Sequence, residues 1–433
     1  MAAQPQDGFG AAPGGVTDPT ITGPKIQAYA WVVFALTFGL LISDYMARQV
    51  LNAVFPLLKA EWALSDGQLG LLSGVVAIMV GLLTFPLSLA ADRWGRVKSL
   101  TVMAVLWSLA TLLCAAATNY GQMLAGRVLV GVGEAAYGSV GIAVVVSAFP
   151  KRLRATLSAA FMAGGLLGQV LGVGIGGSVA AAHGWRMAFL IIALSGLALA
   201  VLYPILVSEN RLACLSEASG QTPYERERAF PKLGSLFVGR TVKCAYVGSG
   251  LQLFVAGALP AWLPTYFNRY YELPVDGAAS LAALFLAICG IGMVVCGVIS
   301  DRLFSRPEQR VTLAAGYSLA CAILLGAALA LPPGPPQLVL LGLAIFLAAA
   351  TTGPAGALVA GLTPAAIHGT AFATLTLANN FLGLAPGPIV TGWLADRVGL
   401  LGALQWLPLA SIAAALVFLR ARQPSRAQIA FAE

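Results

Sequence analysis

Residues 208–240, SENRLACLSEASGQTPYERERAFPKLGSLFVGR, form the longest polar stretch in the interior of an apolar chain. Six long apolar runs precede this segment and six follow it, and the other breaks between runs are short. The runs cover residues 28–57, 67–90, 98–118, 122–148, 154–181, 186–207, 241–267, 279–300, 311–331, 337–361, 369–394 and 402–420. Because a membrane helix needs roughly 20 apolar residues, the pattern predicts twelve transmembrane helices in two groups of six.

The composition excludes an ordinary soluble domain. Of 433 residues, 59% are hydrophobic and only 10% are charged, with a mean hydropathy of +0.85, whereas soluble domains carry about 25% charged residues. The apolar runs are continuous, and the strands of a membrane β-barrel would instead alternate apolar and polar residues. The predicted fold class is therefore an all-α polytopic membrane protein with twelve transmembrane helices arranged as two six-helix repeats.

The basic residues indicate which helix ends face the cytoplasm. With the N-terminus placed inside, nineteen Lys and Arg residues fall in cytoplasmic segments and four in outer segments, which is the bias of the positive-inside rule. The four outer residues are Lys59, Arg186, Arg269 and Arg397. This distribution accounts for the net charge of +8 and gives no reason to expect a nucleic-acid partner. Both termini are predicted to be cytoplasmic, in a multi-pass cell-membrane protein that suits a bacterial inner membrane.

The runs also predict the domain boundaries and an internal duplication. We expect a disordered cytoplasmic tail at 1–27, helical bundles at 28–207 and 241–420, a cytoplasmic linker at 208–240 and a second tail at 421–433. Two pairs of similar motifs relate the bundles: Asp92-Arg93 and Asp301-Arg302 are 209 residues apart, and Gly184 and Gly399 are 215 apart. Nearly equal offsets indicate one duplication, and parallel six-span repeats are a transporter architecture.

No arrangement typical of an enzyme occurs in the sequence. The six cysteines and two histidines show no zinc-ligand spacing, and there is no GxxxxGK[ST] loop for a nucleotide. We therefore expect no metal, no cofactor and no enzymatic or ATP-driven activity from this chain.

The segment after the second run carries a family resemblance. Asp92-Arg93-Trp94-Gly95-Arg96 resembles the loop 2–3 signature of the major facilitator superfamily, and the stretch from Gly297 to Asp301-Arg302 resembles its second copy. Ser88 stands where the first signature usually has Gly, and Phe304 stands where the second copy has its later Gly. The resemblance covers residues 28–420 and implies a twelve-helix transporter that works by alternating access.

The fourth run narrows this resemblance. Arg127 followed by two glycines is similar to the arginine motif of span 4 in that superfamily. The string GVGEAAY at 131–137 is similar to that of spinster-like lipid transporters and of anion:cation symporters that carry sugar acids. Members of both groups often have an adjacent Asp-Arg pair in span 1. Here the matching positions are Ala47-Arg48, and the acid is Asp44, one helical turn earlier.

Four ionisable residues fall inside the predicted spans, where each is costly and so marks a candidate site. Asp44 and Arg48 lie in the first span, and Arg127 and Glu134 lie in the fourth. These two helices run in opposite directions and rise about 1.5 Å per residue. Asp44 and Glu134 are therefore expected at a similar depth near the bilayer centre, with both arginines nearer the outer surface.

These charges predict ion coupling and anion binding. Glu134 and Asp44 are predicted to couple transport to protons, because a carboxyl group in a low-dielectric site can load and release a proton. Arg48 and Arg127 are predicted to bind the substrate, because a guanidinium can hold a carboxylate or phosphate through two hydrogen bonds. The alternative is a static set of salt bridges that joins span 1 to span 4.

The second half of the chain has no matching charges. Its candidate substrate-binding side chains are Gln252 and Tyr266 in the seventh span and Asn379 and Asn380 in the eleventh. The alternative role for such groups is hydrogen bonding between helices.

A conformational latch is predicted in the cytoplasmic loops, as the resemblance implies. Its residues are Asp92, Arg93, Arg96, Asp301 and Arg302. In the resembled superfamily, the acid of this loop lies near the N-terminus of a neighbouring helix, where the helix dipole favours negative charge. The alternative is a simple solvated turn.

Together these features predict a secondary active transporter, coupled to protons, that moves a small organic anion with a carboxylate by alternating access. The alternative substrate is a lysophospholipid or another amphiphile, as in spinster-like proteins. A uniporter or channel without proton coupling is a further alternative. The expected partners are the substrate, protons and the lipid bilayer, and the protein is expected to be a monomer.

Overall fold

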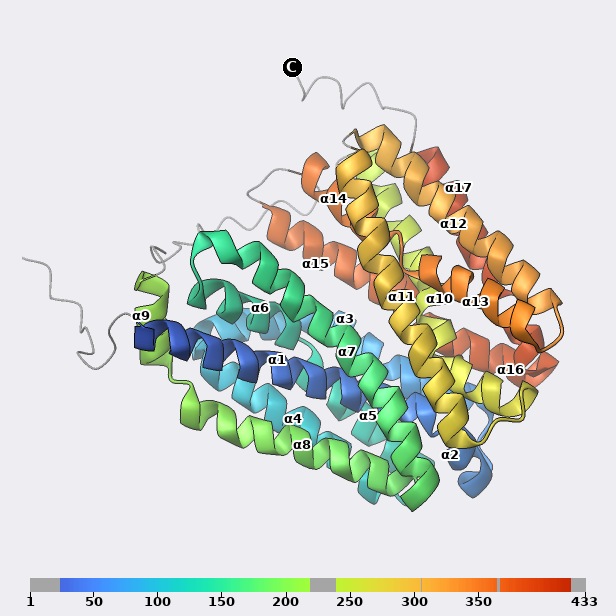
Figure 1. Cartoon of the computed structure of the whole chain (residues 1–433), viewed down its shortest axis with the longest axis horizontal. Coiled ribbons are helices and arrows are strands. Elements are labelled where there is room, and N and C mark those ends of the chain that lie inside the picture. Colours follow the sequence, from blue (N-terminus) through green and yellow to red (C-terminus); the bar gives the residue numbers. More distant parts are fainter. Residues whose placement is uncertain (1–23, 219–238, 305, 364–366, 422–433) are drawn as a thin grey trace, which may run out of the picture.

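The computed structural model describes residues 24–218, 239–304, 306–363 and 367–421, and these are almost entirely helical. The first group of helices comprises α1 (Pro24–Ala53), α2 (Phe55–Trp62), α3 (Asp66–Trp94), α4 (Arg96–Ala116), α5 (Tyr120–Glu134), α6 (Tyr137–Ala148), α7 (Lys151–His183), α8 (Trp185–Leu206) and α9 (Glu209–Ala218). The second group comprises α10 (Arg240–Tyr270), α11 (Val275–Leu303), α12 (Pro307–Ala330), α13 (Pro335–Ala348), α14 (Thr352–Leu362), α15 (His368–Asn379), a π-helical turn (Asn380–Leu384), α16 (Pro386–Leu404) and α17 (Leu407–Arg420). Figure 1 shows the first group in blue to green and the second in yellow to red. The predicted all-α membrane fold is confirmed.

The membrane spans follow the predicted apolar runs. Ten helical stretches among the described residues, from Ala28–Ala53 to Pro335–Leu362, are long and apolar enough to cross a bilayer. The last two predicted runs correspond to Thr370–Leu404 and Leu407–Arg420. These helices are long and apolar enough to cross a bilayer only when they are taken together as one pair, which is bent by 72°. Between those two runs, Gly399 leaves the helical conformation inside α16, with φ 78° and ψ 160°. The 72° bend itself lies between Leu404 and Leu407. The described residues therefore give ten spans, or eleven if the bent pair is one span, where twelve were predicted.

The fourth span of each group is broken near its middle. In the first group α5 ends at Glu134 and α6 begins at Tyr137; in the second, α13 ends at Ala348 and α14 begins at Thr352. Thr352 follows Tyr137 by 215 residues, the same offset that separates Gly184 from Gly399. Local composition explains both breaks, because glycines precede the first and a proline, which lacks an N–H, follows the second.

The two groups touch along two helix pairs in which small residues face each other. Gly177 of α7 lies against Ala279 of α11, and Gly70 of α3 lies against the carbonyl group of Pro388 in α16. Small residues let membrane helices approach closely. We call the end of the molecule where α3 begins the Asp66 end and the end where α4 begins the Arg96 end. The groups meet near the Asp66 end and diverge toward α9 and α14 (Figure 1).

The predicted linker starts with a helix that is docked on the first group. Glu209, the first residue of α9, accepts the backbone N–H of Val97 at 2.7 Å, at the N-terminus of α4. Leu212 and Leu215 on the same helix are buried. The remainder of the predicted linker and most of the two predicted tails lie outside the described residues. The helices that border them begin at Pro24 and Arg240, close to the predicted starts of the two bundles.

Two glycines at turns between helices, Gly184 and Gly399, allow the fold to be tested through backbone conformation alone. Gly184 (φ 85°, ψ 158°) and Gly399 (φ 78°, ψ 160°) occupy a region that is essentially restricted to glycine. A Cβ atom at either position would meet no atom within 4 Å. We therefore expect Gly184→Ala and Gly399→Ala each to cost about 1–3 kcal/mol of stability, which lowers the melting temperature of the detergent-solubilised protein.

The matched control for this measurement is Gly316→Ala. Gly316 is in the interior of α12, and a Cβ there also meets no atom within 4 Å. Because alanine favours the helix more than glycine does, the control should melt at or above the wild-type temperature. Indistinguishable melting temperatures for all three variants would contradict the turn conformations.

Candidate functional site

A buried ion pair joins the first and fourth spans. Arg48 on α1 donates from Nε to Oε2 of Glu134 on α5 at 2.9 Å. The Glu134 side chain is 1% exposed and the Arg48 side chain is 22% exposed. Because α5 ends at Glu134, the break in this span places the carboxylate at the end of a half-helix. In the described part of the chain, Nη1 and Nη2 of Arg48 have no hydrogen-bond partner.

Asp44 completes this cluster, one turn before Arg48. Its carboxyl group is close enough to that of Glu134 for their charges to interact, and both residues are buried. Asp44 Oδ1 and Glu134 Oε1 accept a hydrogen bond from no donor in the described structure. Two neighbouring buried carboxyl groups repel strongly when both are ionised. The pair is therefore suited to take up a single proton.

Arg127 of α5 is fully buried, and its guanidinium is bonded to the backbone. It donates to the carbonyl oxygens of Ala47 and Arg48 at 2.9 Å each and to that of Leu72 at 3.3 Å. These bonds tie α5 to α1 and α3 and leave no free face for a substrate. In this conformation Arg127 holds the backbone at Ala47 and Arg48, and its role in substrate binding stays a prediction.

Two tyrosines border the cluster. The ring of Tyr45 lies 5.6 Å from Cζ of Arg48 and packs against Gly165 of α7. Tyr137, the first residue of α6, donates to the carbonyl oxygen of Thr37 at 2.7 Å and contacts the indole of Trp107 edge-on. The glycine of the seventh helix thus leaves room for the aromatic ring that lies beside Arg48.

The candidate residues of the second group lie in three places. Gln252 donates to the carbonyl oxygen of Ala348 at 3.2 Å, where α13 ends. Asn380 begins the π-helical turn, which directly follows Asn379. The amide oxygens of all three residues (Gln252, Asn379 and Asn380) accept no hydrogen bond within the described structure. Tyr266 lies one turn from the end of α10 and is bonded to a side chain of α13 at 3.0 Å, so the structure does not bring it to the charged cluster.

Two of the predicted latch residues are bonded within their own groups. Arg96 donates to the carbonyl oxygen of Ala143 at 3.5 Å, and Asp301 pairs with Arg310 at 3.5 Å. Arg93 and Arg302, the other two basic latch residues, are exposed. The side chain of Asp92 lies outside the described part of the structure.

The Asp66 end is closed by an ion-pair network between the two groups. Arg269 of α10 donates to both carboxylate oxygens of Asp66 at 2.7 and 2.8 Å. Lys59 adds a third bond at 2.7 Å, and the Asp66 side chain is only 5% exposed. Next to this network, the ring of Phe55 on α2 lies 5.3 Å from that of Trp262 on α10.

Asp396 of α16 adds a contact that the sequence analysis missed. Its carboxylate accepts the backbone N–H groups of Asp66 at 2.7 Å and Gly67 at 2.8 Å, at the N-terminus of α3. A repeated pattern could have revealed it: residues 91–95 read Ala-Asp-Arg-Trp-Gly and residues 395–399 read Ala-Asp-Arg-Val-Gly. Each pattern ends in a glycine with positive φ. Spans 2 and 11 therefore carry the same motif at opposite ends of the molecule.

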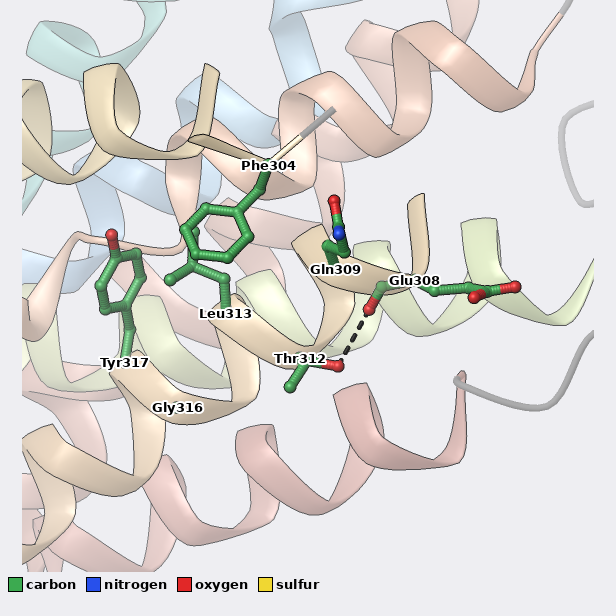
Figure 2. Close-up of a pocket in the computed structure, with 7 residues that line it drawn as sticks. All are labelled: Phe304, Glu308, Gln309, Thr312, Leu313, Gly316 and Tyr317. Carbon is green, nitrogen blue, oxygen red and sulfur yellow. Dashed lines mark hydrogen bonds between the residues drawn. The ribbon is translucent and has the colours of Figure 1, made fainter. Parts of the chain in front are cut away.

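A groove of about 510 Å³ lies apart from the charged cluster, between Phe304 and the first half of α12 near the Arg96 end. Figure 2 shows Phe304, Leu313 and Tyr317 gathered along it, with the carboxylate of Glu308 extending away from them. The backbone carbonyl of Glu308 accepts the hydroxyl of Thr312 at 2.9 Å. The groove contains none of the candidate residues.

Comparisons with known proteins point to one family. Residues 37–385 match the Major Facilitator Superfamily. The chain is 23% identical over 374 residues to the hexuronate transporter of Bacillus subtilis (strain 168), covering 85% of this chain and 88% of that protein. It is 25% identical over 403 residues to the "Probable L-galactonate transporter" of Escherichia coli (strain K12), covering 89% and 86%. A solved bacterial homolog of the human lysosomal transporter Spinster, in an inward-facing and occupied conformation, has a TM-score of 0.80 at 18% identity and covers 94% of this chain and 99% of that one.

The Asp396 contact predicts a shift in conformation when it is removed. Asp396→Ala leaves the first N–H groups of α3 without their acceptor, and hydrogen bonds to charged groups contribute about 1.5–3 kcal/mol each. We expect the closed Asp66 end to lose population by about tenfold. Spin labels at Ala60 in α2 and Pro333 after α12, in a background without native cysteines, should then report an added longer distance.

The control for this measurement is Asp276→Ala. Asp276 is an exposed acid in the first turn of α11, which begins at the same end of the molecule. Its removal should leave the distance distribution as in the wild type. If Asp396→Ala also leaves the distribution unchanged, the contact does not hold this end closed.

Proposed function

Because the chain belongs to the Major Facilitator Superfamily, a family of membrane transporters and not of enzymes, we propose that it moves a small organic carboxylate together with a proton. The predictions of the family and of a multi-pass transporter in the cell membrane are confirmed. The identity of the substrate and the coupling to protons are proposals, and they rest on the site.

One observation carries the proposal: an arginine that can bind an anion is held by an acid that can bind a proton. Arg48 is bonded to Glu134 through Nε alone, and its Nη atoms are unoccupied in the described structure. The Glu134 carboxyl group in turn interacts electrostatically with that of Asp44. Protonation of the carboxyl pair weakens the hold on Arg48, which then binds a substrate carboxylate through two hydrogen bonds. Loss of the proton restores the ion pair and releases the anion.

The polar groups of the second bundle favour a hydroxylated anion. The amide oxygens of Gln252, Asn379 and Asn380 lack donors, and the hydroxyl groups of a sugar acid could supply them when the bundles close around it. The hexuronate and L-galactonate transporters are named for substrates of this kind.

We propose that the Asp66 end faces outward, as the distribution of Lys and Arg indicates. The closed network of Asp66, Arg269 and Asp396 then belongs to the inward-facing conformation. Alternating access requires this network to open while the latch residues at the Arg96 end come together. The six-helix bundles at 28–207 and 241–420 are the units proposed to rock.

The test is uptake driven by a pH gradient in proteoliposomes. The panel contains D-glucuronate, L-galactonate and lysophosphatidylcholine, with wild type, Glu134→Gln, Asp44→Asn and Arg48→Lys. We expect a sugar acid to accumulate with wild type and Glu134→Gln to abolish accumulation. Arg48→Lys keeps the charge but loses the two-pronged contact, so it should raise KM by about tenfold.

The matched control is Glu308→Gln, which changes an exposed acid near the start of α12 and should transport as wild type does. If lysophosphatidylcholine is transported and sugar acids are not, the amphiphile alternative replaces the carboxylate. If a substrate crosses without protons, and Glu134→Gln transports it normally, the coupling role of the pair is wrong.

A further inference from the structure

The membrane interior of the described structure contains only four ionised side chains. Asp44, Arg48, Arg127 and Glu134 lie in the central turns of their spans. Every other Asp, Glu, Lys or Arg in the described spans lies within about one turn of a helix end or of the Gly399 kink. The site therefore has no further charge with which to balance a substrate.

The charges of these four residues sum to zero when both acids are ionised. Two guanidinium groups balance two carboxylates. Asp44, Arg127 and Glu134 are buried, and the Arg48 side chain is 22% exposed. Burying a net charge in a low-dielectric region costs several kcal/mol. The empty, deprotonated site is thus already neutral, which permits the bundles to close around it without a substrate.

When a substrate with a single carboxylate is bound, the site has zero net charge at only one protonation state of the carboxyl pair. The groups that face the carboxyl pair are Arg48 from α1, Arg127 from α5, and the phenols of Tyr45 and Tyr137 from α1 and α6. The phenols remain neutral, and both arginines remain charged. One proton on the pair gives the site a charge of +1, and one monoanion returns it to zero.

From this balance we propose that transport is electroneutral, with one proton carried for each monocarboxylate. The inference rests on the proposed function and adds its stoichiometry and its driving force. Zero or two protons with a monoanion would close the site around a net charge of −1 or +1. The pH gradient alone then sets accumulation, and the membrane potential contributes nothing.

The experiment uses the full chain in proteoliposomes loaded with a pH-sensitive dye, with D-glucuronate and L-galactonate as probes. The membrane potential is set by valinomycin and potassium, independently of the pH gradient. We expect uptake of the transported probe to approach a tenfold concentration ratio per pH unit, as one proton per anion requires, with no change in rate at either sign of potential. On a solid-supported membrane, the same probe should move protons without net current.

Two results would overturn parts of this account separately. Accumulation near a hundredfold per pH unit, or net positive charge moving in the direction of the substrate, would show more than one proton per anion and sink the stoichiometry alone, leaving proton-coupled transport intact. The absence of any accumulation driven by the pH gradient, for both probes, would overturn the proposed function and the stoichiometry together. Protein-free liposomes give the baseline for both measurements.

Discussion

An ionised side chain inside the hydrocarbon layer must be neutralised or hydrogen-bonded, and the first group of helices is assembled around that requirement. Arg127 meets it through three backbone carbonyl groups and so ties α5 to α1 and α3. Arg48 meets it through a single bond to Glu134. The two arginines therefore differ in bonding: Arg127 is hydrogen-bonded to backbone carbonyl groups alone, and Arg48 is bonded to an acidic side chain.

The same requirement explains why this pair of bundles is asymmetric although the chain is duplicated. Both bundles have a broken fourth span at equivalent positions, but only the first places an acid there. At the matching break the second bundle has the carbonyl group of Ala348, bonded to the uncharged Gln252. A charged cluster in each half would double the cost of closing the bundles around an empty site. The proposed division, with proton coupling in one half and recognition of hydroxyl groups in the other, avoids that cost.

Closure at the Asp66 end depends on contacts that are strong but few. Asp396 and Arg269 reach from the second bundle to the start of α3, where the helix dipole and unpaired N–H groups favour a carboxylate. Small residues such as Gly70 and Gly177 allow the helices to meet closely beside them. Ion pairs and hydrogen bonds close this end, whereas close contacts between small residues lie toward the middle of the interface. This arrangement is suited to an interface that opens as a unit.

Local sequence determined the helices, their breaks and the identity of the four buried charges, because hydrophobic run length and the cost of charge in lipid act within one span. The motif resemblance likewise gave the family from contiguous residues around Asp92 and Arg127. Only the tertiary structure decided which arginine is bonded to the backbone and which to Glu134. It also decided that Asp396 caps a helix about 330 residues earlier in the chain. Those outcomes depend on how the helices pack and rotate against one another. The charges and periodicity of a single helix do not specify which atoms a neighbouring helix will present to it.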